Sequence, residues 1–188
     1  MYNYEDIKSI HLEVTQNCQA ACPMCDRNCS GEGVNPHIKL DELSLEDCKR
    51  IFSPSFIAQL NTMYMCGNLG DPIVAKDTLE IFRYFRKHNS QMWLSMNTNA
   101  GAQNETWWAE LSNIFGRMGS VIFSVDGLED TNHIYRQGVT WEIVERNMRA
   151  FVKGGGRARW DFLIFVHNEH QVDEARRLAD EIGVERFM

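Results

Sequence analysis

The chain alternates short apolar segments with longer amphipathic ones five times in succession. The apolar segments are expected to be strands, at residues 9–15, 62–66, 92–97, 120–125 and 159–166. The amphipathic segments are expected to be helices, at residues 43–52, 79–88, 105–115, 141–153 and 172–182. Strict alternation of this kind predicts parallel strands joined by right-handed helical crossovers.

A sixth strand is expected to begin at residues 185–188, where the chain ends. We therefore predict an α/β fold, a partial (β/α)6 parallel barrel that ends at the start of its sixth strand. Its 188 residues are expected to form one domain, residues 1–188. In such folds the reactive side chains lie at the carboxyl ends of the strands.

The net charge and the hydropathy of the chain disfavour nucleic-acid and membrane partners. The formal net charge of −7 disfavours a nucleic-acid partner and a polybasic membrane-binding surface. No apolar run approaches the ~18–20 residues that cross a bilayer. The first six residues are polar and acidic, unlike a secretory signal peptide. We expect a cytoplasmic protein with no membrane partner.

The cysteines gather directly after the first expected strand. Cys18, Cys22 and Cys25 have the spacing C-x3-C-x2-C. Because the sequence shows no export signal, we expect these cysteines to bind a metal rather than to form disulfides. Three thiolates on a tight loop are able to bind three irons of a [4Fe–4S] cluster and leave the fourth iron open. The alternative is a structural zinc site with Cys29 as fourth ligand, although zinc sites usually separate two cysteine pairs by a longer insert.

The cysteine spacing and its place after the first strand resemble the radical S-adenosylmethionine superfamily. The resemblance implies that Cys18, Cys22 and Cys25 hold the cluster and that S-adenosylmethionine chelates the open iron. It also implies reductive cleavage to a 5′-deoxyadenosyl radical, which abstracts hydrogen from a substrate. Met24 occupies the position of a family aromatic residue near the adenine, and its flexible side chain is able to fill the same space.

The turn after the second strand resembles the family's Gly-Gly-Glu-Pro motif. Gly70 would let the backbone approach the ligand closely, and Asp71 would accept a hydrogen bond from the methionyl ammonium group. Asp replaces Glu here, so the carboxylate is one carbon shorter. By itself, Gly70-Asp71-Pro72 would be interpreted as an ordinary turn, and only its place after the second strand favours the family motif.

Two further strand ends match family elements. Thr98 and Asn99 resemble the Thr-Asn-Gly element, with Ala100 in place of the glycine, and would bind ribose hydroxyls or substrate. Without the resemblance, they would be interpreted as a capped loop. Asn168, after the fifth strand, matches an asparagine that would face the ribose.

The end of the fourth strand resembles the family's Ser-x-Asp-Gly element. Ser124 would contact S-adenosylmethionine, whereas Asp126 is expected to order the turn. Downstream, Tyr135-Arg136 matches a family pair in which the arginine binds the methionyl carboxylate. The alternative for Arg136 is a free surface arginine.

The three remaining cysteines match no cluster ligand. Cys48 and Cys66 lie in an expected helix and strand, so both are expected to be buried small hydrophobic residues. Cys29 is a loop thiol that could contact the substrate.

The resemblance extends from about residue 7 to the end of the chain and favours the branch of molybdenum-cofactor synthesis enzymes and peptide-modifying maturases. Because no cysteine follows Cys66, we expect either a truncated chain or a short member without auxiliary clusters. The resemblance implies a low-potential electron donor such as flavodoxin or ferredoxin and a substrate that is a small molecule or a peptide. A non-catalytic iron–sulfur or S-adenosylmethionine binding domain is the second interpretation, and a structural zinc protein is the third.

Overall fold

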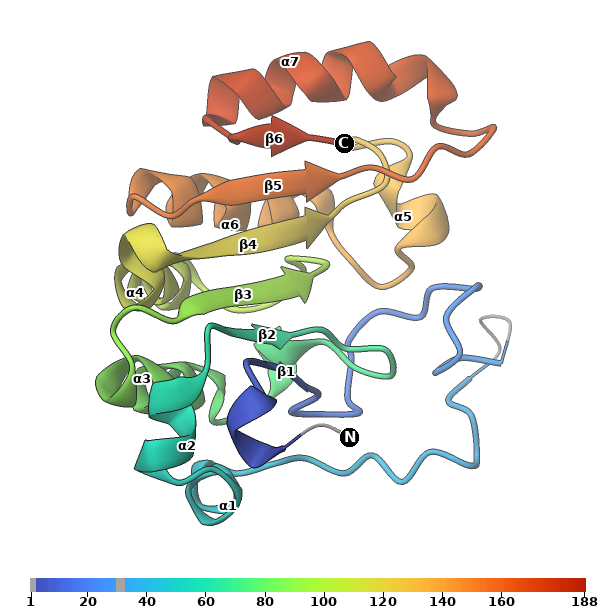
Figure 1. Cartoon of the computed structure of the whole chain (residues 1–188). Helices are drawn as coiled ribbons and strands as arrows, with labels where there is room; N and C mark the ends of the chain where they lie inside the picture. Colours follow the sequence, from blue (N-terminus) through green and yellow to red (C-terminus); the bar gives the residue numbers. More distant parts are fainter. Residues whose placement is uncertain (1–2, 30–32) are drawn as a thin grey trace.

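The computed structural model describes residues 3–29 and 33–188. Its six strands form one sheet in chain order, and every neighbouring pair is parallel (Figure 1). The strands are β1 (Ser9–Leu12), β2 (Thr62–Met65), β3 (Trp93–Thr98), β4 (Gly119–Ser124), β5 (Ala158–Asp161) and β6 (Arg186–Phe187). The predicted α/β fold, a partial barrel of six parallel strands, is confirmed.

Helices connect successive strands. They are α1 (Leu45–Ile51), α2 (Pro54–Gln59), α3 (Thr78–His88), α4 (Glu105–Phe115), α5 (Asn132–Tyr135), α6 (Trp141–Lys153) and α7 (Val172–Ile182). Single 3₁₀ turns occur at η1 (Tyr4–Asp6), η2 (Pro72–Val74), η3 (Gly116–Met118) and η4 (Glu169–Gln171). Within residues 3–29 and 33–188, none of the helices combines the length and apolar character that a membrane span requires.

The expected helices are present, and the helices α2 and α5 are additional. Ser44 caps α1 as its sequence suggests, because its hydroxyl accepts from the Asp47 N–H while the Asp47 carboxylate accepts from the Ser44 N–H. The expected helix over residues 43–52 is followed at once by α2. The separate helix begins because Ser53 caps the Phe56 N–H and Pro54 occupies its first position.

Two strands end several residues earlier than their apolar patterns predict. β1 ends at Leu12 rather than at residue 15, because the chain then turns to pair with the segment before α1 through the bridge between Thr15 and Glu42. β5 ends at Asp161 rather than at residue 166, because its neighbour β4 pairs with it only as far as Ser124 opposite Asp161, after which the Leu163 N–H donates to the Asp126 carboxylate. A strand extends only as far as a neighbour supplies hydrogen bonds.

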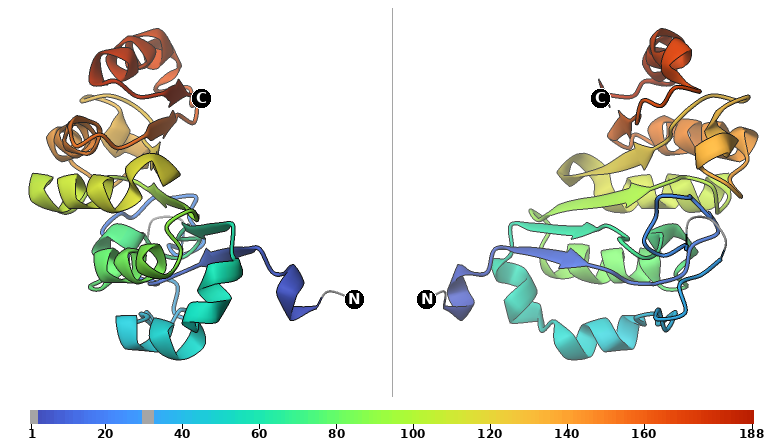
Figure 2. Two further views of the ribbon diagram at one scale, coloured as in Figure 1. Left: turned by 60° about the vertical axis from the view of Figure 1, so that its left-hand side comes forward. Right: turned by 90° about the vertical axis from the view of Figure 1, so that its right-hand side faces the viewer.

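The two faces of the sheet differ. The helices α3, α4 and α6 cover one face, and the opposite face is open (Figure 2). Residues on the covered face alternate with residues on the open face along each strand. The covered face supplies the core residues Leu12, Met63, Met65, Leu94, Met96, Val121, Phe123, Ala158 and Trp160. The open face carries partly exposed side chains such as Tyr64, Ser95 and Arg159.

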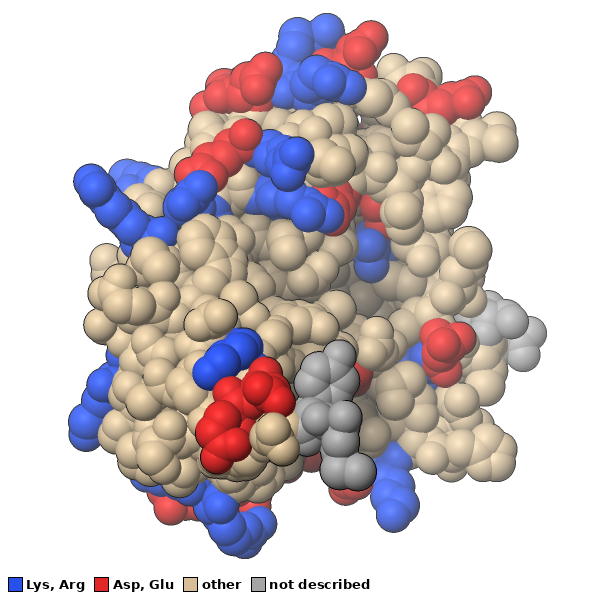
Figure 3. Space-filling model, viewed as in Figure 1, with Lys and Arg blue, Asp and Glu red and all other residues tan. Residues whose placement is uncertain are grey.

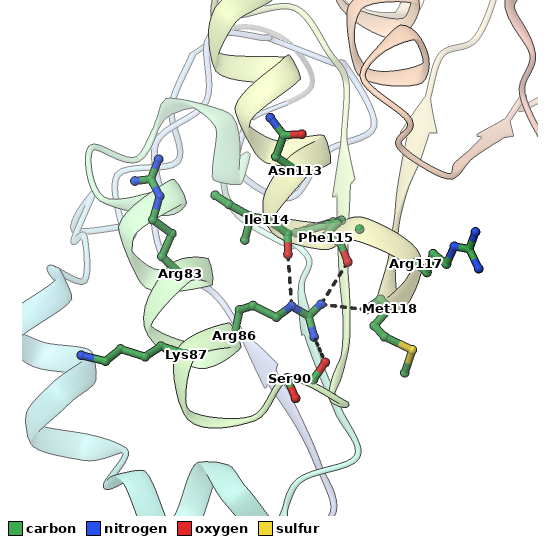
Figure 4. A pocket seen from close by; sticks show the side chains of 10 residues that line it. Arg83, Arg86, Lys87, Ser90, Asn113, Ile114, Phe115, Arg117 and Met118 are labelled. Atoms are coloured by element: carbon green, nitrogen blue, oxygen red, sulfur yellow. Dashed lines mark hydrogen bonds between the residues drawn. The ribbon is translucent and has the colours of Figure 1, made fainter.

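At the amino end of the sheet, one arginine closes a polar gap between two β/α units. Arg86, near the end of α3, reaches the last turn of α4 and the loops around it (Figure 4). Its guanidinium donates at 2.7–3.2 Å to five carbonyls, those of Ser90, Met92, Ile114, Phe115 and Met118. Burial lowers the pKa of Arg86. The surrounding pocket of about 450 Å³ therefore contains a structural arginine whose donors are occupied.

We expect Arg86→Met to destabilise the protein by roughly 2–4 kcal/mol, because several carbonyls lose a charged donor. Urea unfolding followed by circular dichroism measures the change. Lys87→Met is the matched control, since Lys87 is exposed and lines the same pocket. Equal stability of the two variants would contradict the anchoring role.

Candidate metal centre

The cysteine loop follows β1 and crosses the carboxyl ends of the strands (Figure 1). Cys18, Cys22 and Cys25 line a single pocket of about 310 Å³ there. The surface over the strand ends is hollowed, and acidic and basic side chains lie beside the hollow (Figure 3). Segments 18–25 and 66–71 are thus brought to one site although they are distant in sequence.

Nitrogen donors face two of the three sulfurs. The Ala20 N–H lies 3.4 Å and the Asn99 amide nitrogen 3.6 Å from the Cys18 sulfur. A terminal nitrogen of Arg136 lies 3.8 Å from the Cys22 sulfur. Such donors stabilise a thiolate, which is the form that binds a metal.

The pKa values of the Cys18 and Cys22 thiols are raised. Burial raises the pKa of Cys18 to about 11, and the neighbouring Asp71 carboxylate adds to the shift. Burial also raises the pKa of Cys22, although the Arg136 charge opposes it. At neutral pH these groups are therefore thiols, and a metal must displace their protons when it binds.

The turn after β2 packs directly against the cysteine loop. A Cβ atom at Gly70 would lie 2.2 Å from the Thr15 carbonyl oxygen and 2.7 Å from that of Asn17. The Asp71 N–H donates to the same Asn17 carbonyl at 2.8 Å. Only glycine fits this contact with the cysteine loop. The close approach of Gly70 to the ligand stays a prediction.

Asp71 links the ends of two strands. Its carboxylate, which is buried, accepts hydrogen bonds from the Thr98 hydroxyl at 3.1 Å and from the Asn99 N–H at 2.8 Å. It also accepts from the Ile73 N–H at 3.1 Å. Burial raises the pKa of Asp71, and these donors oppose that shift. Gly70, Asp71, Thr98 and Asn99 all line the pocket.

The end of β3 contacts the cysteine loop through Asn99. Its side-chain oxygen accepts from the Gln19 amide at 2.6 Å and from the Gly101 N–H at 2.8 Å. Ala100 stands where the family element has glycine. Its φ is 59°, which is in the left-handed region of backbone conformation. This conformation explains why glycine suits the position and why alanine is strained there.

The end of β4 supplies a buried ion pair. Arg136 Nε donates at 2.7 Å to the Asp126 carboxylate, which also accepts from the Leu163 N–H at 2.7 Å. Burial raises the pKa of Asp126 against the effect of Arg136. Burial also acts to lower the pKa of Arg136, but Asp126, Cys22 and Tyr135 together outweigh it and the pKa is raised. Arg136 is therefore not a free surface arginine; together with Ser124 it lines the pocket.

Two of the expected cofactor-binding residues lie outside the pocket lining. Met24 is 75% exposed. Asn168 is fully buried, and its amide donates to the carbonyls of Asp126 and Leu163 at 2.9 Å while its oxygen accepts from the Phe165 N–H. Their contacts with adenine and ribose stay predictions.

Several pocket residues were not anticipated. Arg27 and Asn28 are buried and line the pocket, yet no sequence pattern distinguishes them from an exposed polar loop. The expectation of burial is confirmed for Cys48 but wrong for Cys66, which is partly exposed and lines the pocket because β2 has already ended at Met65. Cys29 is exposed and lies outside the pocket lining.

The donor set fits an iron–sulfur cluster. In the described part of the chain, no three Cys, His, Asp or Glu side chains converge on one metal ion. A cubane cluster does not require such convergence, because each thiolate binds a different iron. Three thiols in one pocket, with nitrogen donors near two of them and two guanidinium groups in the lining, match that requirement.

We expect Asp126→Asn to destabilise the metal-free protein by about 3 kcal/mol, because it leaves Arg136 as a buried cation without its counter-charge. The double variant Asp126→Asn/Arg136→Met should lose less stability than the sum of the single variants. Urea unfolding measures both, with the exposed Glu129→Gln as control. Strictly additive losses would contradict the ion pair.

Comparisons with known proteins agree with this geometry. A family model described as the Radical SAM superfamily matches residues 12–180. Streptococcus suis SuiB bound to S-adenosylmethionine has a TM-score of 0.75 and 15% identity, with coverage of 96% of this chain and 40% of SuiB. The structure of anSMEcpe with bound AdoMet has a TM-score of 0.72 and 17% identity, with coverage of 96% and 49%.

A third structure, methylornithine synthase (PylB), has a TM-score of 0.65 and 13% identity, with coverage of 97% of this chain and 53% of PylB. The chain thus spans between 40% and 53% of the length of these three proteins, and the likeness shows their common fold. A comparison with curated protein sequences found no match. Because the family model covers most of its length, this chain belongs to the radical SAM superfamily, and membership implies a [4Fe–4S] cluster and S-adenosylmethionine as cofactors.

Proposed function

We propose that residues 1–188 form the catalytic core of a radical S-adenosylmethionine enzyme and that Cys18, Cys22 and Cys25 ligate three irons of its [4Fe–4S] cluster. The observation that carries this proposal is the convergence of the three thiols in one pocket with the ends of β2, β3 and β4. The pocket volume of about 310 Å³ lies at the lower end of the range for small-molecule sites.

The strand ends would bind S-adenosylmethionine. The Asp71 carboxylate keeps acceptor capacity beyond its three bonds and would accept from the methionyl ammonium group. Arg136 has terminal N–H groups on the pocket side and would bind the methionyl carboxylate. Thr98, Asn99 and Ser124 would bind polar groups of the nucleoside. Gly70, whose backbone packs against the cysteine loop, would let the turn approach the cofactor closely.

A cluster held by Cys18, Cys22 and Cys25 would supply the one electron that cleaves S-adenosylmethionine to methionine and a 5′-deoxyadenosyl radical, the species that would abstract hydrogen from the substrate. The chain's own contribution is positional. Asn99 holds Cys18 against the end of β3, while the buried Asp126 holds Arg136 beside Cys22. These links keep the thiols and the cofactor-binding groups in one rigid arrangement, which lowers the entropic cost of orienting the cofactor.

The substrate class is proposed to be a peptide or a small molecule. SuiB has been solved with its precursor peptide SuiA, and anSMEcpe has been solved with the Cp18Cys peptide. These structures support a peptide more directly than a nucleic acid, as does the net charge of −7. A low-potential electron donor such as flavodoxin or ferredoxin would supply the electron.

Anaerobic reconstitution with iron and sulfide tests the proposal. We expect wild-type protein to bind about four irons and, with dithionite and S-adenosylmethionine, to release 5′-deoxyadenosine. Cys22→Ala should lose the cluster and at least a hundredfold of deoxyadenosine formation while circular dichroism remains native-like, because the helices and strands do not depend on this loop. Cys29→Ala is the matched control and should keep both iron and activity, since its thiol lies outside the pocket.

The same measurements separate the alternatives. Cluster formation without deoxyadenosine would favour a non-catalytic binding domain. Zinc bound in place of iron, and lost equally from Cys22→Ala and Cys29→Ala, would favour a structural zinc site.

A further inference from the structure

Arg27 is a buried cation. Its exposed fraction is 7%, although it lies in a loop and follows Cys25 by two residues. Arginine is rarely buried this deeply without an anionic partner, because the desolvation of its charge is costly. We therefore expect either a carboxylate of this chain or a bound anion to balance the charge of the Arg27 guanidinium.

The recorded partners of Arg27 are neutral. Nε donates to the Gln16 carbonyl at 3.0 Å, and Nη1 donates to the Asn28 side-chain oxygen at 3.1 Å. Among residues 3–29 and 33–188 no carboxylate forms an ion pair with it. Arg136, the second arginine of the pocket, differs because Asp126 balances its charge.

The position of Arg27 indicates which anion would balance it. Arg27 lines the pocket together with the thiols of Cys18, Cys22 and Cys25. Thiolates that bind iron carry negative charge into this pocket.

The guanidinium is also held in place. Asn28, which accepts from Arg27, donates through its own amide to the Cys22 carbonyl at 3.4 Å. The Arg27 carbonyl accepts from the Asn35 N–H at 2.8 Å. Arg27 is therefore fixed relative to the cysteine loop, as a preorganised electrostatic group requires.

We propose that Arg27 is the counter-charge of the cluster and makes the cluster easier to reduce. The inference rests on the proposed function, because it requires a cluster on Cys18, Cys22 and Cys25. Reduction adds one negative charge to the cluster, so a fixed cation beside it stabilises the reduced state more than the oxidised one. Burial strengthens this effect, since water screens the interaction poorly there. Arg27 is thus a positioning and electrostatic residue.

The test compares three variants after anaerobic reconstitution. Arg27→Gln removes the charge, Arg27→Lys keeps it but loses the planar fork, and Arg117→Gln removes an exposed charge at the other end of the sheet. Redox titration followed by electron paramagnetic resonance gives the ratio of reduced to oxidised cluster, and iron and sulfide assays give the loading. Neither readout depends on turnover.

We expect Arg27→Gln to lower the ratio of reduced to oxidised cluster ~10-fold at a fixed potential, which is ~59 mV for a one-electron couple. Arg27→Lys should restore most of the wild-type ratio, and Arg117→Gln should match wild type. If Arg27→Gln loads iron fully and keeps the wild-type ratio, the proposal is overturned.

Loading separates the remaining outcomes. If Arg27→Gln fails to bind a cluster while Arg27→Lys binds one with the wild-type ratio, the charge is required and the proposal stands. If neither variant binds a cluster, Arg27 acts only as a brace of the loop and the proposal is overturned. A wild-type protein without a cluster would overturn the proposed function first, and this inference with it.

Discussion

Parallel strand pairing is the constraint on which the rest of the structure depends. Two adjacent parallel strands cannot be joined by a tight turn, so each connection returns over the covered face through a helix. As a result, all carboxyl ends of the strands lie at the same edge of the sheet. Residues as distant in the sequence as Cys18 and Arg136 therefore line one pocket at this edge.

Two buried carboxylates then convert this edge into a defined site. Asp71 accepts from the Thr98 hydroxyl and the Asn99 N–H and so joins the turn after β2 to the end of β3. Asp126 accepts from Arg136 and from the Leu163 N–H and so joins the end of β4 to the segment after β5. Each carboxylate bears the cost of burial because several donors satisfy it. The loops of the site are thereby positioned by the sheet itself.

The electrostatics of the pocket follow from its contents. The thiols of Cys18 and Cys22 are neutral at neutral pH because burial raises their pKa, so a bound metal is what creates negative charge there. Arg27 and Arg136 line the same pocket, and within the described residues only Arg136 has a carboxylate partner. The pocket lining thus contains one guanidinium group, that of Arg27, whose charge no carboxylate of the described residues balances.

Local patterns in the sequence determined the order of the strands and helices, the cysteine motif and the bounds of α4, α6 and α7. Helical periodicity is a property of neighbouring residues, and the signals that end these helices, such as Gly154 and Gly183, lie next to them. Tertiary structure alone decided where β1 and β5 end, that Cys66 lies in the pocket and that Arg27 is buried. These features depend on which distant segments become neighbours, and hydrogen bonding, burial and charge pairing all arise from that proximity.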